Sequence, residues 1–384
     1  MIAQILHPDD SDFLIYLSGK YSNHSVLNHK SFFIEVRYVA ENIFVESESF
    51  LNEFIKTNRL FYKKESDAKY DLLFQIDSFE IIKNHLQQIL LVKHNALANE
   101  IRGAIKNYNR INEYKIGNKT FSFHRPYLMG ILNITPDSFS DGGKFMSIND
   151  AVKHALKMID DGADIIDIGG ESTRPGSEPI TAEEEIKRVI PVITEILNKR
   201  PEVILSIDTY KSRVAFKALE AGVKIVNDIS GFTFDPEIAD VCKEYDATAV
   251  LMHIRGTPKT MQNLIEYKEV VSDIYDFLKM QTDFALNKGI DKIIIDPGIG
   301  FGKTINHNFN IIKRLKDFKS LGFPILIGVS RKSFIGKTLN LEVNERDLPT
   351  AAIESVSIFN SARILRTHNV QNGKQIIKLL GEII

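Results

Sequence analysis

The chain has 384 residues, of which 43% are hydrophobic, and its formal net charge is −2. This length exceeds that of one average domain, so a large domain with a smaller companion is expected. The balanced charge and the lack of a Lys/Arg-rich tract argue against nucleic acid as a partner. With a single cysteine, Cys242, the chain cannot form an internal disulfide or a cysteine metal cluster.

The start of the chain predicts where the protein works. Residues Met1–Asp10 lack the basic start and apolar core of a secretory signal, and no apolar stretch reaches transmembrane length. We therefore expect a cytoplasmic protein that has no membrane partner.

Residues 1–110 differ in amino-acid composition from the rest of the chain, because they are rich in Phe, Tyr, Asn and Lys and contain few glycines. A strand is predicted over Phe32–Tyr38, and one or two helices from Ile81 to about Asn107. We predict a smaller α+β domain over 1–110 with an accessory or dimerisation role. A second catalytic domain is the alternative, but this region contains no chemical motif that supports it.

A hairpin is predicted where this region ends. The short segments Tyr114–Ile116 and Thr120–Phe123 flank the turn dipeptide Gly117-Asn118. Because it comes directly before a series of strands, it is a candidate plug for the N-terminal mouth of a barrel formed by those strands.

From residue 127 onward, short apolar runs alternate with segments of helical spacing. The expected strands are Leu128–Ile134, Asp164–Ile168, Val203–Ile207, Lys224–Val226, Thr248–Met252, Lys292–Ile295, Pro324–Gly328 and Arg363–Leu365, and the expected helices include Ile148–Ile159, Ala182–Asn198, Lys211–Ala221 and Asn308–Ser320. Eight strands with intervening helices predict a (β/α)8 TIM barrel over residues 111–384. An open doubly wound sheet would usually have fewer strands.

Every expected strand ends in polar residues. The first ends at Asn133 and opens into a loop over 135–145 of small, polar and glycine residues. The other ends carry Gly169–Gly176, Asp208-Thr209, Asn227-Asp228, Met252–Gly256, Asp296–Lys303, Ser330–Ser333 and Arg366–His368. A single Asp after a strand is commonly a helix cap. Polar groups at all eight ends instead indicate an active site, because barrel enzymes place their chemistry there.

The residue types suggest a heterocycle and a phosphate. Asp208, Asn227 and Asp296 form an acceptor-rich set suited to a flat ring with many N–H donors, and the aspartates would stabilise developing positive charge. The donors suited to a phosphate group are Arg174, Arg366 and His368.

Other side chains could complete such a site. Asn133 could offer an oxygen to Mg2+, while Lys332 and Ser333 stand at a predicted helix start, which favours an anion. Phe139 and Phe301 could pack on an aromatic ring or simply anchor their loops. The sequence shows no protease-like nucleophile and base, although Lys332 could in principle form a Schiff base.

Four motifs together resemble the dihydropteroate synthase family. They are Asn133–Gly143, Gly169–Gly176, Asp296–Lys303 and Ser330–Ser333, and the resemblance extends over about residues 112–384. It implies a (β/α)8 barrel enzyme of folate synthesis. The implied reaction joins 6-hydroxymethyl-7,8-dihydropterin diphosphate to 4-aminobenzoate and releases diphosphate and 7,8-dihydropteroate.

The resemblance also implies roles for individual residues. The implied pterin pocket is Asp208, Asn227, Met252, Asp296 and Lys332; the diphosphate site is Asn133, Arg366 and His368, with Asn133 near Mg2+; and the 4-aminobenzoate pocket is Phe139, Thr173, Arg174, Pro175, Phe301 and Ser333. The loops at 135–145 and 171–180 would close over both substrates, and a homodimer is expected. Asp208, Asp296, Lys332, Arg366 and His368 are the expected catalytic residues.

The implied mechanism is dissociative, with a pterin cation that Asp208 and Asp296 stabilise before the amine attacks. Two positions depart from the family pattern: Asn369 stands where an acid is usual, and Ser361 where a glycine is common. We expect Asn369 to keep a structural hydrogen bond and Ser361 to affect packing only. The alternatives are a pterin-dependent methyltransferase and a pterin-binding protein without catalysis.

Overall fold

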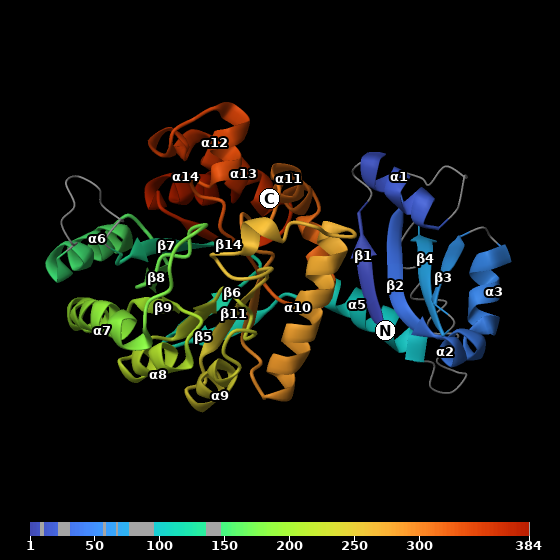
Figure 1. Cartoon of the computed structure of the whole chain (residues 1–384), viewed down its shortest axis with the longest axis horizontal. Helices are drawn as coiled ribbons and strands as arrows, with labels where there is room; N and C mark the ends of the chain where they lie inside the picture. Colours follow the sequence, from blue (N-terminus) through green and yellow to red (C-terminus); the bar gives the residue numbers. More distant parts are fainter. Residues whose placement is uncertain are drawn as a thin grey trace. The chain divides into compact units, whose positions relative to one another are not determined.

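The computed structural model describes residues 1–7, 11–21, 31–56, 59–66, 68–76, 96–135 and 147–383. The chain divides into two compact units (Figure 1). The first contains Met1–Arg110 together with Lys313–Phe323, and the second contains Ile111–Ile312 and Pro324–Ile384. Within the described ranges, no helix combines the length and apolar character needed to cross a bilayer.

The second unit is a closed barrel of eight parallel strands. In chain order the strands are β7 (Tyr127–Asn133), β8 (Ile165–Gly169), β9 (Ile204–Asp208), β10 (Ile225–Asp228), β11 (Thr248–Met252), β12 (Ile293–Asp296), β13 (Ile325–Ile327) and β14 (Ala362–Thr367). Each pairs with its neighbour in sequence, and β14 pairs with β7 to close the ring. This closed ring confirms the predicted (β/α)8 barrel. The prediction was possible because short apolar strands buried on both faces are typical of that fold.

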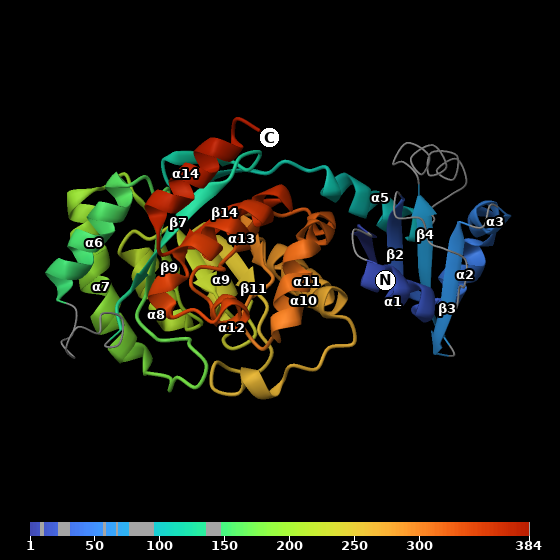
Figure 2. The ribbon, with the colours of Figure 1, turned by 90° about the horizontal axis from the view of Figure 1, so that it is seen from above.

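Helices surround these strands (Figures 1 and 2). They are α6 (Ile148–Asp160), α7 (Ala182–Lys199), α8 (Ser212–Glu220), α9 (Glu237–Glu244), α10 (Val270–Asn287), α11 (Ile305–Lys313), α12 (Ser333–Leu339), α13 (Asp347–Phe359) and α14 (Val370–Leu380), with short 3-10 turns at Met261–Asn263 and Val343–Glu345. The predicted helices at 148–159, 182–198 and 211–221 are confirmed within one or two residues.

The predicted helix over 308–320 is wrong as a single helix. The α-helix α11 ends at Lys313, and a 3-10 helix, η2, runs over Leu315–Leu321. Its buried apolar residues Leu315, Phe318 and Leu321 recur every third position. That spacing is the 3-10 period, so in this conformation the three side chains align along one buried face of the segment.

The predicted hairpin is confirmed as β5 (Glu113–Ile116) and β6 (Lys119–Ser122), and Gly117 in its turn has a φ of 59°. Tyr114, Ile116, Phe121 and Phe123 form one buried cluster with the first residues of several barrel strands. The Tyr114 hydroxyl donates to the carbonyl of Ile293, 2.9 Å away, at the start of β12. The hairpin thus closes the N-terminal mouth and leaves the carboxyl ends of the strands for a site.

The first unit is built on an antiparallel sheet of order β1-β2-β4-β3. Its strands are β1 (Ile2–Leu6), β2 (Phe32–Ala40), β3 (Leu60–Ser66) and β4 (Lys69–Ile76), and its helices include α1 (Ser11–Lys20), α2 (Glu41–Glu46), α3 (Glu48–Lys56) and α5 (Ala96–Tyr108). The predicted strand in β2 is confirmed. Of the predicted helix from Ile81 to Asn107, the part after residue 95 is α5, and the rest lies outside the described residues.

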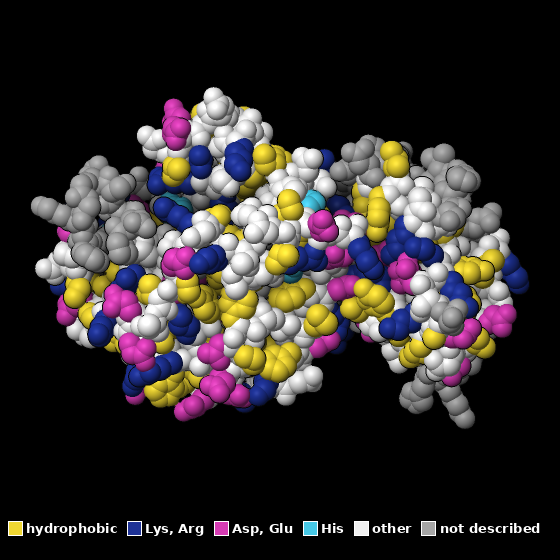
Figure 3. Space-filling view, in the orientation of Figure 1, with side chains coloured by type: hydrophobic (Ala, Val, Ile, Leu, Met, Phe, Trp, Pro, Cys, Tyr) yellow, Lys and Arg dark blue, Asp and Glu magenta, His cyan; other side chains and the backbone are white. Residues whose placement is uncertain are grey.

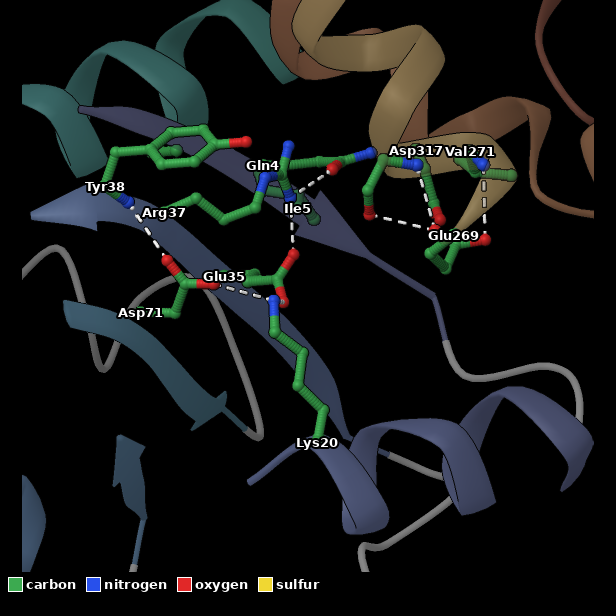
Figure 4. Close-up of polar contacts among 12 residues, drawn as sticks. Gln4, Ile5, Lys20, Glu35, Arg37, Tyr38, Asp71, Glu269, Val271 and Asp317 are labelled. Atoms are coloured by element: carbon green, nitrogen blue, oxygen red, sulfur yellow. Dashed lines mark hydrogen bonds and ion pairs between the residues drawn. The ribbon is translucent and has the colours of Figure 1, made fainter. Parts of the chain in front are cut away.

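A buried ionic network ties α1 to this sheet (Figure 4). The Lys20 ammonium lies 2.9 Å from a Glu35 oxygen and 2.8 Å from an Asp71 oxygen. Arg37 also pairs with Glu35, and it donates to the side-chain oxygen of Gln4 at 2.9 Å. Each buried charge has an opposite partner, which offsets the cost of removing it from water.

The segment Lys313–Phe323, which comes from between α11 and β13, packs against β1 and α5 of the first unit. The Asp317 carboxylate accepts from the His7 backbone N–H at 3.0 Å, and Ser320 accepts from the backbone N–H of Ile5 at 3.2 Å. The Arg314 guanidinium lies 3.4 Å from the centroid of the Phe13 ring. Residues that the sequence assigns to the barrel thus belong to the core of the first unit.

Acidic and basic side chains are interspersed over the face that Figure 3 shows. This mixed distribution agrees with the net charge of −2. Specific attraction for an anion therefore has to arise inside a local site.

The serine at position 361 affects the backbone as well as the packing, so the expectation of a packing effect alone was incomplete. Its φ is 82°, in the left-handed region that favours glycine, at the turn from α13 into β14. We expect Ser361→Gly to raise the free energy of unfolding by about 1 kcal/mol, since the strain of a side chain there is removed. Denaturant unfolding would measure it, with Ser355→Gly inside α13 as a control that should destabilise. A variant no more stable than the parent would contradict the strain argument.

Candidate active site

The register of four neighbouring strands brings polar residues into one layer. Asn133 pairs with Gly169, Gly169 with Asp208, and Asp208 with Asn227, all at the carboxyl ends of their strands. A Cβ atom added to Gly169 would lie 3.5 Å from Asn133 Oδ1 and 3.6 Å from Asp208 Cβ. Both distances are ordinary van der Waals contacts, so Gly169 lies between these two side chains and next to each of them.

Arg366 crosses the barrel mouth from β14 to this layer. Its Nε donates to Asp167 Oδ2 and its Nη2 to Asp208 Oδ2, both at 2.6 Å. The Asn227 amide donates to the same Asp167 oxygen at 2.9 Å. The predicted phosphate donor Arg366 is thus held between two carboxylates, which fix its guanidinium beside the carboxyl ends of β8 and β9.

Asp167 was missed by the sequence reasoning, which recorded it only as part of a strand. It is fully buried on β8, and Oδ1 has no hydrogen-bond partner among the described residues. A signal was available, because a charged residue inside the otherwise apolar run Ile165–Ile168 is unusual unless it is paired.

Burial dominates the electrostatics of the acidic residues. It raises the pKa of Asp208 to about 7, against the opposing effect of Arg366 and with a further contribution from Asp167. Burial also raises the pKa of Asp296 and brings that of Asp228 to about 6. Asp228 is a structural acceptor, because it receives hydrogen bonds from Ser230 and from the Phe232 backbone.

Asp296 and Lys332 meet at the glycine-rich loop after β12. Asp296 Oδ1 accepts from the Gly298 backbone N–H at 2.7 Å. Lys332 Nζ donates to the Ile299 carbonyl and lies 4.5 Å from the centroid of the Phe301 ring. Burial lowers the pKa of Lys332 to about 8, although the charge of Asp296 opposes this.

Two details fix the shape of that loop. Gly298 has a φ of 72°, and a Cβ atom there would lie 2.0 Å from the His253 carbonyl oxygen, so only glycine fits. The buried Lys303 ammonium lies 3.1 Å from His253 Nδ1 and donates to the Phe301 carbonyl at 2.8 Å. Lys303 therefore anchors the loop that carries Phe301, a role that the sequence reasoning did not identify.

His368 lies beside the loop after β13. Its Nδ1 is 3.0 Å from Ser330 Oγ, and its backbone N–H donates to the same oxygen at 3.1 Å. Burial lowers the pKa of His368 to about 3, with further contributions from cations that include Arg366 and Arg174. The imidazole is therefore neutral near pH 7 and acts as a donor, not as a cation.

The start of α12 differs slightly from expectation. Lys332 is its N-cap residue and has no side-chain capping hydrogen bond, while Ser333 is the first helical residue and is exposed. Ser333 is thus not a plain N-cap.

Asn369 keeps a structural hydrogen bond, as expected. Its Nδ2 donates to Asp347 Oδ2 at 3.0 Å, and its oxygen caps α14 by accepting from the Asn372 backbone N–H. Asp347 also binds Arg331 through two hydrogen bonds of 2.6 and 2.9 Å. Because an acid at 369 would face Asp347, the amide suits this chain better.

The remaining predicted residues line the edges. Met252 is buried in an apolar cluster that Phe301 packs against. On the loop after β8, Thr173 is half-buried, whereas Arg174 and Pro175 are exposed. Phe139 and most of the predicted loop over 135–145 lie outside the described residues.

The strand-end groups and the glycine-rich loop define a (β/α)8-barrel enzyme whose mouth combines buried acceptors with cationic donors. A family model described as "Pterin binding enzyme" matches residues 129–368. Dihydropteroate synthase of Synechocystis is 48% identical over 258 residues, which are 66% of this chain and 89% of the relative. That of Clostridium beijerinckii is 47% identical over 274 residues, or 70% and 99%.

Solved structures agree with these relatives. A Yersinia pestis dihydropteroate synthase matches with a TM-score of 0.67 and 35% identity, covering 71% of this chain and 99% of that one. A Xanthomonas albilineans enzyme, solved with 4-aminobenzoic acid, gives 0.66 and 35%, covering 71% and 98%. The chain belongs to the dihydropteroate synthase family, and it is a transferase.

Proposed function

We propose that this chain joins 6-hydroxymethyl-7,8-dihydropterin diphosphate to 4-aminobenzoate in folate biosynthesis, releasing diphosphate and 7,8-dihydropteroate. The observation that carries the proposal is the convergence of Asp208, Asn227 and Arg366 at one end of the barrel. Relatives that share 42–48% of their residues bear the name of this activity, and one similar structure is described with 7,8-dihydropteroate.

The pterin would bind among Asp208, Asn227, Met252, Asp296 and Lys332. The carboxylate and amide oxygens can accept from the N–H groups of the ring, while Lys332 can donate to a ring acceptor. Asn227 and Asp208 are held by Asp167 and Arg366, so this part of the pocket is rigid before substrate binds. A preorganised polar site stabilises charge at little reorganisation cost.

The proposed reaction begins with cleavage of the carbon–oxygen bond, and the electron pair leaves with diphosphate. Asp208 and Asp296 stabilise the resulting pterin cation, while Arg366 and His368 donate to the leaving diphosphate. The neutral amine of 4-aminobenzoate then forms the carbon–nitrogen bond, and its extra proton passes to solvent. This order of steps requires groups that stabilise a cation and a leaving anion, and the site has both. It requires no covalent intermediate on the enzyme.

The resemblance also suggests Mg2+, which would neutralise charge on the diphosphate. Among the described residues no group of three His, Cys, Asp or Glu side chains could hold a metal. Asn133, half-buried at the end of β7, offers one amide oxygen. That fits an ion held mainly by substrate phosphates and water with a single protein ligand, as Mg2+ commonly is.

The second substrate, 4-aminobenzoate, would bind beside the pterin. Arg174 could pair with its carboxylate, and Ser333 at the start of α12 could donate to it. Phe301, with Lys332 on its ring, offers a face for the benzene ring. Thr173, Pro175 and Phe139 complete the proposed pocket.

The pKa values of two site residues predict a bell-shaped pH profile. Asp208 must be ionised to stabilise the cation, so kcat/KM should rise with pH through about 7. Lys332 should lose its proton above about pH 8, and kcat/KM should then fall. Each limb approaches about tenfold per pH unit. Steady-state rates from about pH 6 to about pH 9 would test this. Lys332→Arg should remove the alkaline limb, and a flat profile would contradict both assignments.

We also propose a homodimer through α13. This helix buries the polar residues Thr350, Glu354 and Ser357, yet Leu348 is 81% exposed and Phe359 49% exposed. Although Ile358 is also buried, a helix that exposes several large apolar side chains while it buries three polar ones suits a second copy of the chain. Light scattering should give twice the mass of one chain.

The matched variants for this surface are Leu348→Glu combined with Phe359→Glu, and Leu286→Glu on α10 as the control. The double variant should be a monomer, while the control should still be a dimer. A wild-type protein with the mass of one chain would contradict the proposal.

For residues 1–110 we propose a noncatalytic role in supporting the barrel fold. The supporting observation is that the first unit takes up Lys313–Phe323, which connects α11 to β13. Residues of this unit therefore hold a segment that lies, along the chain, between two elements of the barrel.

The function is tested by diphosphate release from the purified full chain, with the pterin diphosphate and Mg2+, in the presence and absence of 4-aminobenzoate. Release coupled to dihydropteroate formation is expected. Pterin binding without release would favour a binding protein. Methyl transfer with a corrinoid partner would favour the methyltransferase alternative.

A further inference from the structure

The loop that follows β8 is closed by its own first residue. Glu171 begins the segment 171–180, and its Oε2 accepts from the backbone N–H of Ile180 at 3.0 Å. Inside the segment, Ser177 Oγ donates to the carbonyls of Ser172 and Arg174 at 2.5 and 2.8 Å. The Glu171 carboxylate thus joins the two ends of the loop that carries Thr173, Arg174 and Pro175.

A lysine outside the proposed substrate pockets holds that carboxylate. Lys211 Nζ lies 2.5 Å from Glu171 Oε2 and 2.5 Å from Glu185 Oε2 on α7. The side chains of Glu171 and Glu185 are only 5% and 1% exposed, so the ammonium bridges two buried anions. Tyr210 adds a hydroxyl that donates to Glu171 Oε1, and Lys211 Nζ lies 4.7 Å from the centroid of its ring.

The other contacts of the loop are weaker. Lys259 and Glu178 form an ion pair at 2.6 Å, but their side chains are 59% and 71% exposed. Exposed ion pairs contribute little because water and salt screen them. Gly176 adds one backbone hydrogen bond of 3.2 Å to the Pro258 carbonyl. Among the described residues, the main polar anchor of the loop is therefore the buried Glu171 carboxylate, which Lys211 holds through an ion pair and Tyr210 through a hydrogen bond.

We propose that Lys211 is a positioning residue for the second substrate: its ammonium group holds Glu171 and so keeps the loop 171–180 in the conformation that receives 4-aminobenzoate. This inference rests on the proposed function. The pterin-pocket side chains have separate supports, because Arg366 holds Asp208 and Asp167 holds Asn227. Loss of Lys211 should therefore weaken binding of the aromatic acid selectively.

The expected kinetic effect follows from preorganisation. When only a fraction of the molecules have the loop in the binding-competent conformation, the apparent affinity equals the intrinsic affinity multiplied by that fraction. In Lys211→Met we expect the KM for 4-aminobenzoate to rise about tenfold or more, with kcat at saturation and the KM for the pterin diphosphate nearly unchanged. Lys211→Arg should restore much of the affinity, since it keeps a cation between the two carboxylates.

A second variant guards against a folding defect. Removing Lys211 leaves the buried Glu185 without its cation, which could destabilise α7. Glu171→Gln keeps the pair between Lys211 and Glu185 but removes the charge from the loop. It should give the same selective rise in KM. Lys217→Met, which removes an exposed partner of Glu220 on α8, is the matched control and should change neither KM.

Hydrogen exchange supplies a readout besides activity. In Lys211→Met and Glu171→Gln, amides of 171–180, and that of Ile180 above all, should exchange faster while those of β9 keep their protection. Equal losses for both substrates, or unchanged exchange and KM in Glu171→Gln, would overturn the proposal. If wild-type protein formed no dihydropteroate, the proposed function would fail instead, and the exchange result would still report on the loop.

Discussion

Replacing Asp208 with Asn is expected to lower kcat by about 10²- to 10³-fold while the protein stays folded. The substitution keeps the shape of the side chain and removes its charge. In the proposed reaction that charge stabilises the pterin cation as diphosphate leaves. Arg366 keeps its 2.6 Å contact with Asp167, so its guanidinium should stay in place.

The decisive measurement for Asp208→Asn is the rate of diphosphate release in a single turnover. Pterin affinity should change much less than this rate, because the amide still offers an oxygen acceptor. Asp240→Asn, which removes an exposed partner of Lys288, is a matched control that should have wild-type kinetics. Diphosphate release at the wild-type rate in Asp208→Asn would contradict the role of its charge. The acid limb of the pH profile should also disappear in any residual activity.

The barrel and its polar strand ends could be predicted because both signals are local. An apolar run that stops at Asn133 or Asp208 marks a buried strand and the point where it opens to a site. The order of such ends around a closed ring then follows from chain order alone, since each parallel strand pairs with the next. The hairpin could also be predicted from a local signal, the turn dipeptide Gly117-Asn118 between two short segments.

The contacts that hold the site residues in place could not be predicted from local signals. The contact between Arg366 and Asp167 joins residues 199 positions apart, and its geometry exists only once the ring has closed. Lys211 stands at the start of a helix, where its type suggests an exposed side chain, yet it bridges two buried carboxylates. Propensity and periodicity carry no information about such partners.

The helix expected over 308–320 failed for a related reason. Its spacing suits an α-helix locally, but Asp317 instead accepts from the backbone N–H of His7, directly after β1, and Ser320 from that of Ile5 in β1. Those partners lie in a part of the chain that the sequence assigned to a separate domain. Tertiary contacts therefore decide the local conformation here.

A chain that lacks residues 1–110 is expected to be poorly soluble or strongly destabilised. In the full chain Leu315 and Phe318 are fully buried, and Leu321 is 4% exposed. The segment that holds them packs with β1 and α5, both of which the deletion removes. Exposing three large apolar side chains costs on the order of 5 kcal/mol, a large part of the stability of a typical domain.

A rescue variant separates this explanation from general damage. In the truncated chain 111–384, replacing Leu315, Phe318 and Leu321 together with Ser should improve solubility, because the exposed face is then polar. The same triple change in the full chain should instead destabilise it, since it empties a buried site. Solubility, thermal midpoint and dihydropteroate formation would be compared across the four proteins. If the unmodified truncated chain were soluble, as stable as the parent and fully active, the supporting role of the first unit would be wrong.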